Sequence, residues 1–251
     1  MPNPGTVKLV RLEVTRALRN KKYLFFTVLY PAALFLMLGG TLSGTTKVMG
    51  TELTMPAFYM VAMASFGALT AVLMGNSERI AKEREAGWVR QLRLTSLPGH
   101  GYVIAKTASA GVLSLPAILV VFAVAASAKG VRFEAWQWFA LTGSIWAGSL
   151  VFAALGVALG YLASGDNVRP ITMLCYFGLS ILGGLWMPTA AFPQWLQDIC
   201  AWLPTTAYAG LGHAIELGGA PDAKDVAILA GYFVLFTGAA AWLYRKDSLK
   251  A

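Results

Sequence analysis

The residues that could bind phosphate or a metal do not stand at the spacings that these functions require. Lys106-Thr107 would close a phosphate-binding loop of the form Gly-x-x-x-x-Gly-Lys-Ser/Thr, but His100 and Ala105 occupy the places of its two glycines. The two histidines and two cysteines show neither metal-ligand nor CxxC spacing; they are His100, His213, Cys175 and Cys200. We therefore predict that the chain is not an enzyme, holds no metal and binds no cofactor of its own.

The composition is that of a protein immersed in lipid. Of the 251 residues, 57% are hydrophobic and 13% are charged, whereas soluble domains average about 45–50% apolar and about 25% charged residues. Too few charges remain to cover a water-facing surface. The net charge of +8 does not require a nucleic-acid partner, because an excess of cytoplasmic Lys and Arg produces the same balance in a membrane protein.

Six stretches are long and apolar enough to span a bilayer, which takes about 20 residues per helix. They are residues 23–42, 56–77, 102–128, 136–162, 170–187 and 223–244, and none has a charge in its middle. No linker or internal repeat divides the chain. The sequence therefore predicts an all-α integral membrane protein of six transmembrane helices that forms one domain over residues 1–251.

The basic residues indicate which side of the membrane the two ends of the chain occupy. Most of the 20 Lys and Arg residues precede residue 23, lie within 78–106 or follow residue 244, and those on the other side are Lys47, Lys129, Arg132 and Lys224. The side rich in Lys and Arg faces the cytoplasm. We expect a multi-pass protein of the cytoplasmic membrane with both termini in the cytoplasm.

Three segments are predicted to lie outside the spans. Residues 7–22 have a helical period that indicates an amphipathic helix on the cytoplasmic membrane surface, with its apolar face formed by Val7, Val10, Val14 and Leu18. Residues 187–217 are apolar but interrupted by prolines, which indicates re-entrant or interfacial helices on the extracellular side. Residues 78–101 form a cytoplasmic loop.

This cytoplasmic loop carries the most specific pattern in the chain. Opposite charges four residues apart, Glu78 with Lys82 and Arg79 with Glu83, predict that the second span continues into the loop as a helix, and a glycine at 87 is a natural end for that helix. Aromatic and apolar residues then stand among arginines in 88–94, as in a docking surface. A helical extension lying on lipid headgroups would show the same pattern.

The order of residues in the loop resembles that of the permeases of type-2 ATP-binding-cassette (ABC) exporters. It reads Glu83-Arg84-Glu85-Ala86-Gly87, then Arg90-Gln91-Leu92-Arg93, then Thr95-Ser96-Leu97-Pro98, and Tyr102-Val103-Ile104-Ala105-Lys106 opens the third span. The sequence departs from the family pattern at 98–101 and at Ala105, where the family has Gly before Lys. The resemblance covers the whole chain, because that family also has an N-terminal amphipathic helix, six spans and a broken apolar segment between spans five and six.

The resemblance implies that two permeases, identical or paralogous, pair in the membrane above two cytoplasmic ABC ATPase subunits, which hold the ATP and Mg. A short coupling helix after the loop glycine would contact the ATPase and transmit its closure to the spans. The residues that this contact would use are Glu83, Arg84, Glu85, Gly87, Trp88, Arg90, Leu92 and Arg93.

The second and fifth spans are predicted to line the substrate path and to pack the pair of permeases. An apolar, adaptable lining suits a hydrophobic or amphiphilic drug, antibiotic or lipid-like compound, and ordinary packing would use the same residues: Met60, Met63, Phe66, Phe177 and Trp186. Small residues at four-residue spacing allow helices to approach closely, and those predicted at the dimer contact are Gly67, Ala71, Gly75, Ser180 and Gly184.

Two other classes of protein remain open from the residues. A secondary transporter or channel that works alone typically places ionisable residues inside its spans, and the span interiors here lack Asp, Glu, Lys, Arg and His. A membrane scaffold that transports nothing is the other alternative.

Overall fold

The computed structural model describes residues 4–39, 46–48, 52–88, 91, 99–163 and 165–248. Within these ranges every regular element is a helix, apart from one isolated antiparallel bridge between Lys47 and Thr54. The prediction of an all-α protein is confirmed for this part of the chain.

Five of the described helices are long and apolar enough to cross a membrane: Lys21–Leu38, Met55–Glu85, Tyr102–Ala128, Ala135–Leu162 and Ala223–Asp247. The first consists of α2 (Lys21–Leu24), the π-helical turn η1 (Phe25–Leu29) and α3 (Tyr30–Leu38), and the second of α4 (Met55–Leu69), the π-helical turn η2 (Thr70–Met74) and α5 (Gly75–Glu85). The others are α7 (Gly99–Ala128), α8 (Ala135–Leu162) and α12 (Ala223–Ser248). They match five of the six predicted spans.

The fifth predicted span is shorter than the sequence suggests. Its helix, α9 (Val168–Leu182), has 15 residues and is therefore about 22 Å long, less than the roughly 30 Å of a bilayer core. It ends where Gly183 and Gly184 follow, the second of them at φ +80°. The helix starts close to the predicted residue 170 but ends five residues before the predicted residue 187, and the count of six full-length spans is not confirmed.

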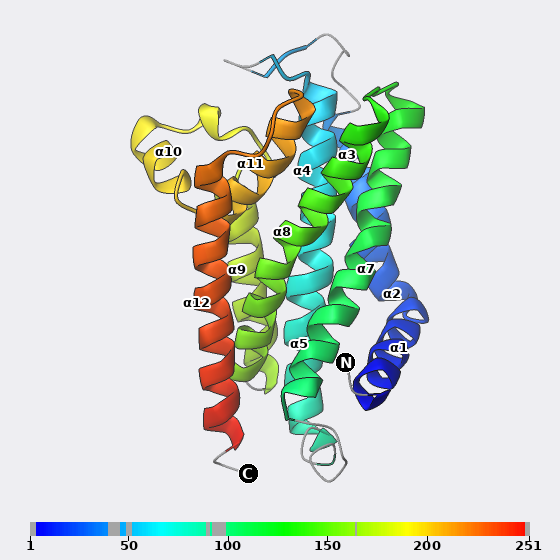
Figure 1. Cartoon of the computed structure of the whole chain (residues 1–251), viewed down its shortest axis with the longest axis vertical. Helices are drawn as coiled ribbons and strands as arrows, with labels where there is room; N and C mark the ends of the chain where they lie inside the picture. The colour runs from blue at the N-terminus through cyan, green and yellow to red at the C-terminus, as the bar shows by residue number, and fades with distance from the viewer. Residues whose placement is uncertain are drawn as a thin grey trace.

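The two ends of the bundle carry different short segments (Figure 1). The helix α1 (Pro4–Leu18), the end of α5 and the last turns of α12 lie at one end, which we call the α1 end. At the other end lie α10 (Gln194–Cys200), α11 (Pro204–Glu216) and the Lys47–Thr54 bridge. Short helices therefore do occupy the predicted segment 187–217, and α11 packs between α4, α8 and α12.

The N-terminal amphipathic helix is interrupted earlier than predicted. Helix α1 ends at Leu18, and Asn20 begins α2 by accepting a hydrogen bond from the Tyr23 backbone N–H at 3.1 Å. Helix α1 packs on α7 through the buried residues Leu9, Glu13 and Ala17, while the predicted apolar face is half-buried or exposed.

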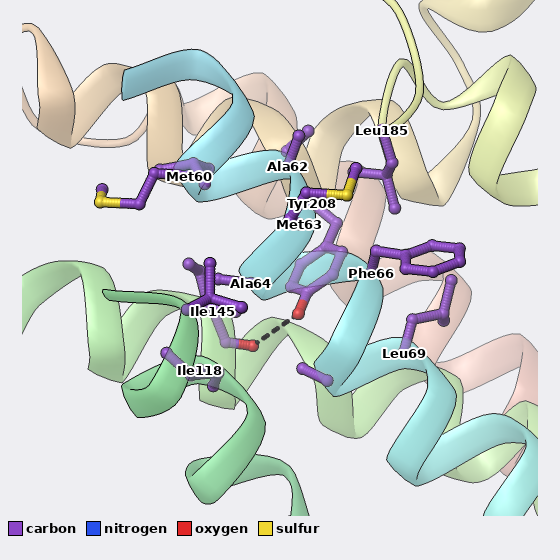
Figure 2. Close-up of a cluster of buried hydrophobic side chains, with 14 of the residues drawn as sticks. Met60, Ala62, Met63, Ala64, Phe66, Leu69, Ile118, Ile145, Leu185 and Tyr208 are labelled. Carbon is purple, nitrogen blue, oxygen red and sulfur yellow. Dashed lines mark hydrogen bonds between the residues drawn. The ribbon is translucent and has the colours of Figure 1, made fainter. Parts of the chain in front are cut away.

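The composite helix α4–η2–α5 runs through the middle of the bundle, and its apolar side chains form the core (Figure 2). Tyr208 of α11 inserts beside it and donates a hydrogen bond to the Ile145 carbonyl at 3.0 Å. Glycines let α8 approach the same helix closely: a Cβ on Gly156 would lie 2.9 Å from the carbonyl oxygens of Val72 and Leu73. The segment that follows α5 therefore continues directly from the centre of the core.

Candidate functional site

The segment at the end of α5 turns sharply away from the helix axis. Gly87 has φ +71°, a conformation that glycine adopts without strain, and nothing lies within 4 Å of where its Cβ would stand. A glycine is therefore needed here because of the backbone conformation, and not because a side chain would clash with a neighbour. Beyond it, Trp88 is 42% exposed, and Glu85 just before it is exposed as well. The predicted helix end at Gly87 is confirmed.

Glu83 points into the protein from the same turn. Its side chain is buried, and its Oε1 accepts a hydrogen bond from the Nζ of the fully buried Lys106 at 2.7 Å. Its Oε2 accepts one from the Tyr102 hydroxyl at 2.7 Å. Arg16 of α1 adds a longer ion pair to Oε1 at 3.7 Å. The end of α5 is therefore bound to the beginning of α7 and to α1.

A second buried carboxylate, that of Glu13, completes this cluster from α1. Its Oε1 lies 2.8 Å from Lys106 Nζ, and its Oε2 lies 3.8 Å from Nη1 of Arg79 on α5. We call Glu13, Arg79, Glu83, Tyr102 and Lys106 the ion network. Charges removed from water are stable only when each has a partner at close range, so the network holds α1, α5 and α7 in one arrangement.

Arg84 binds the other side of the bundle. Its Nη1 donates to the carbonyl oxygens of Gly160 at 2.8 Å and Ala163 at 3.3 Å, where α8 ends. Its Nε donates to Asp247 Oδ2 near the end of α12 at 3.3 Å, and its guanidinium lies 5.0 Å from the centre of the Tyr161 ring. An arginine satisfies the last carbonyls of a helix in this way, and here it joins α5 to both α8 and α12.

The residues predicted to contact the ATPase thus fall into three groups. Glu83 and Arg84 bind other helices of the same chain, Gly87 makes the turn, and Glu85 and Trp88 reach the surface. The remaining three, Arg90, Leu92 and Arg93, lie outside the described residues. Glu13, Tyr102 and Lys106 were not predicted as site residues. Tyr102 and Lys106 belong to the family pattern at the start of the third span, and a carboxylate in the middle of α1 was the signal for Glu13.

The five residues predicted to line a substrate path differ in their exposure. Met60, Met63 and Phe66 are fully buried in the core (Figure 2). Trp186 is half-buried with its ring centre 5.3 Å from that of Phe66. Phe177 is 37% exposed and lines a cavity of about 450 Å³ between the first span, η2, α5 and α9.

The small residues predicted at a dimer contact meet neighbours within the chain. A Cβ on Gly67 would lie 3.1 Å from Pro31 and 3.2 Å from Ala117, and one on Gly75 would lie 3.1 Å from the Tyr23 hydroxyl. Tyr23 also donates to the Ala71 carbonyl at 3.3 Å. Ser180 donates to the Tyr176 carbonyl at 2.6 Å, and Gly184 lies in the turn after α9 at φ +80°.

Comparison with known proteins identifies the family. The family described as ABC-2 family transporter protein matches residues 41–242, which is most of the chain. The chain is also 29% identical, over 241 residues, to the putative transport permease YvfS of Bacillus subtilis (strain 168), with 94% of this chain and 95% of that protein covered. A helical bundle with several membrane-spanning helices fits both findings. This chain belongs to the ABC-2 family of transporter proteins.

Proposed function

We propose that this chain is the membrane subunit of an ATP-driven exporter whose energy comes from a separate ATPase that docks at the α1 end. The observation that carries the proposal is the construction of the α5 end, where an exposed turn continues the central helix of the core and is bound to four other helices. A displacement of this turn would reach α1 and α7 through Glu83, and α8 and α12 through Arg84.

Within this proposal, the two kinds of docking residue have different tasks. Glu85 and Trp88 touch the ATPase, because their side chains reach the surface. Glu83 and Arg84 transmit its movement to the spans, because their side chains bind neighbouring helices. Arg90, Leu92 and Arg93 extend the contact as the short coupling helix.

The proposal includes an orientation and a partner in the membrane. The α1 end faces the cytoplasm, since the segments rich in Lys and Arg gather there, and both termini are cytoplasmic. Helix α9, the fifth span in chain order, completes the set of six crossings together with the residues that follow it. Helices α10 and α11 form the re-entrant segment on the extracellular side. A second permease, identical or paralogous, pairs with this one to complete the path for a hydrophobic or amphiphilic compound.

The test is to purify the tagged chain in mild detergent from its native membrane and to identify the chains that accompany it in stoichiometric amount. We expect a soluble subunit with an intact phosphate-binding loop. Glu85→Ala and Trp88→Ala should lose this subunit while keeping their membrane insertion and their resistance to unfolding. Trp195→Ala is the matched control, because that tryptophan is also exposed but lies in α10 at the opposite end.

Recovery of the permease alone would refute the proposal if an established permease–ATPase pair survives the same extraction. Retention of the subunit by both α5-end variants would refute the docking assignment alone.

A further inference from the structure

We propose that the cavity of about 450 Å³ between the first span, η2, α5 and α9 binds an amphiphile with an anionic headgroup. We call it the α9 cavity. This inference rests on the proposed function and deepens it, since it names the class of compound that the exporter takes up. A volume of this size lies in the range of small-molecule sites, about 300–1,000 Å³.

The deep part of the α9 cavity is aromatic. Phe26 and Tyr30 contribute from the first span, and Tyr176 and Phe177 contribute from α9. The Tyr176 hydroxyl and Thr70 Oγ1 lie 2.5 Å apart, and the Thr70 hydroxyl donates to the Phe66 carbonyl at 2.8 Å. The Tyr176 and Thr70 hydroxyls are therefore satisfied within the wall, and the aromatic rings beside them present apolar surface to the ligand.

The part of the cavity at the α1 end is basic. Among the residues that the structure describes, four cationic side chains line it against one carboxylate, that of Glu78; they are Lys22, Arg79, Lys82 and Arg169. Glu78 is itself engaged, with its Oε1 3.6 Å from Arg169 and its Oε2 3.9 Å from Lys82. A cationic headgroup would therefore compete with two bound cations, whereas an anionic headgroup meets an excess of positive charge.

Each of the three walls, formed by the first span, the second span and α9, has its basic residue at the α1 end of the cavity and its less polar residues deeper in the membrane. On the first span, Tyr30 lies eight residues beyond Lys22, and on α9, Phe177 lies eight residues beyond Arg169, so each aromatic ring is about 12 Å deeper than its basic residue. On the second span, Thr70 lies nine residues from Arg79, about 13 Å in the same direction. This polarity matches a molecule whose headgroup lies at the membrane surface and whose apolar body lies in the membrane.

Arg79 lies where the cavity meets the ion network. Its guanidinium stands 4.6 Å from the centre of the Tyr23 ring and 3.8 Å from Glu13 Oε2. That oxygen is buried without a hydrogen-bond partner among the described residues. A guanidinium has five N–H donors, so an anionic headgroup in the cavity can bind Arg79 and draw it from Glu13. Occupancy of the cavity would then alter the contact of α1 with α5.

The test measures binding to the full chain in nanodiscs of zwitterionic lipid, with any co-purified subunit retained. The probe is a dansyl-labelled long-chain carboxylic acid, compared with its methyl ester and with the amine of the same chain length, each corrected for binding to empty nanodiscs. We expect the acid to bind about tenfold more tightly than the ester, as one charge-assisted hydrogen bond would give. Equal binding of acid and ester, or tighter binding of the amine, would overturn the proposal.

Variants of the basic residues test whether the preference for the acid over the ester arises in the cavity. Arg169→Gln and Arg79→Gln should each reduce the preference for the acid, and Arg79→Lys should retain most of it. Lys8→Gln is the matched control, because Lys8 is an exposed basic residue of α1 outside the cavity. If Arg79→Gln unfolds, Arg169→Gln still decides, since its side chain is 70% exposed. A preference unchanged in Arg169→Gln, or equally reduced in Lys8→Gln, would overturn the proposal.

Native mass spectrometry separates the two sources of such a ligand. An anionic phospholipid retained by the unmodified chain and lost from Arg169→Gln would identify the headgroup of a membrane lipid as the occupant. Binding of the added acid without retained lipid would identify a free amphiphile, and not a membrane lipid, as the occupant. The binding measurement needs no ATPase, so a failure of the proposed docking and a failure of this inference are distinguishable.

Discussion

Replacement of Lys106 by methionine tests whether the ion network holds the α1 end together. Methionine has a similar length and no charge, so Lys106→Met removes the cation and little volume. The Nζ atom lies 2.7 Å from Glu83 Oε1 and 2.8 Å from Glu13 Oε1, and these distances put the two carboxylate oxygens no more than about 5.5 Å apart. The variant would leave two buried negative charges facing each other.

The size of the effect follows from this geometry. Two like charges about 5.5 Å apart repel each other by about 3 kcal/mol at an effective dielectric constant of about 20. Removal of one partner from a buried ion pair generally costs about 3–5 kcal/mol. Because Arg16, Arg79 and the Tyr102 hydroxyl still bind the carboxylates, we expect the free energy of unfolding to fall by about 3 kcal/mol.

The assay is equilibrium unfolding in dodecyl maltoside with increasing sodium dodecyl sulfate, followed by helical circular dichroism. Lys82→Met is the matched control, since that lysine is 76% exposed and lies 3.9 Å from Glu78, a pair worth about 0.5 kcal/mol or less. The double variant Lys106→Met/Glu83→Gln should recover more than half of the loss, because one buried charge remains in place of two. The reasoning is refuted if Lys106→Met unfolds like Lys82→Met, or if the double variant is less stable than Lys106→Met.

Three further variants test the contacts around the central helix in the same assay. Arg84→Leu should lower the free energy of unfolding by about 2–3 kcal/mol, because it leaves an acceptor on α12 and the last carbonyls of α8 without their donor; an unchanged value would contradict the tie between these helices. Gly156→Ala should destabilise the protein by about 1–3 kcal/mol, since its Cβ would lie 2.9 Å from two carbonyl oxygens of η2. Gly143→Ala, on the open face of the same helix, should stabilise it by about 0.5–1 kcal/mol. A change of the same sign in the free energy of unfolding of both variants would refute the close approach of α8. Tyr208→Phe should cost about 1 kcal/mol through the lost hydrogen bond to the Ile145 carbonyl, and a cost near zero would show that this bond adds nothing to the core.

Features that depend on neighbouring residues along the chain could be predicted from the sequence. The membrane class and five of the spans follow from about 20 consecutive apolar residues, whichever helices they pack against. The helix end at Gly87 follows from the freedom of glycine to adopt φ +71°. The breaks in residues 187–217 follow from prolines, which cannot continue a helix.

Features that depend on residues far apart in the sequence could not be predicted in this way. Arg79 and Glu83 stand four residues apart and were expected to pair with each other, yet they bind Glu13 and Lys106 on other helices. Helix α9 ends at Leu182, and the next position must be a glycine because Thr205 of α11 occupies the space that a Cβ on Gly183 would fill. The Thr205 hydroxyl donates to the Leu179 carbonyl at 2.7 Å.

The sequence by itself determined that this protein is a helical membrane protein of the ABC-2 family and that the turn after its second span is its most informative segment. The tertiary structure decided which residues of that turn reach the surface and which bind other helices. It also decided that Met60, Met63 and Phe66 form the core while Phe177 lines a cavity. Hydrophobicity and charge are properties of single residues, but the partner that each side chain meets depends on how its helix is rotated against its neighbours.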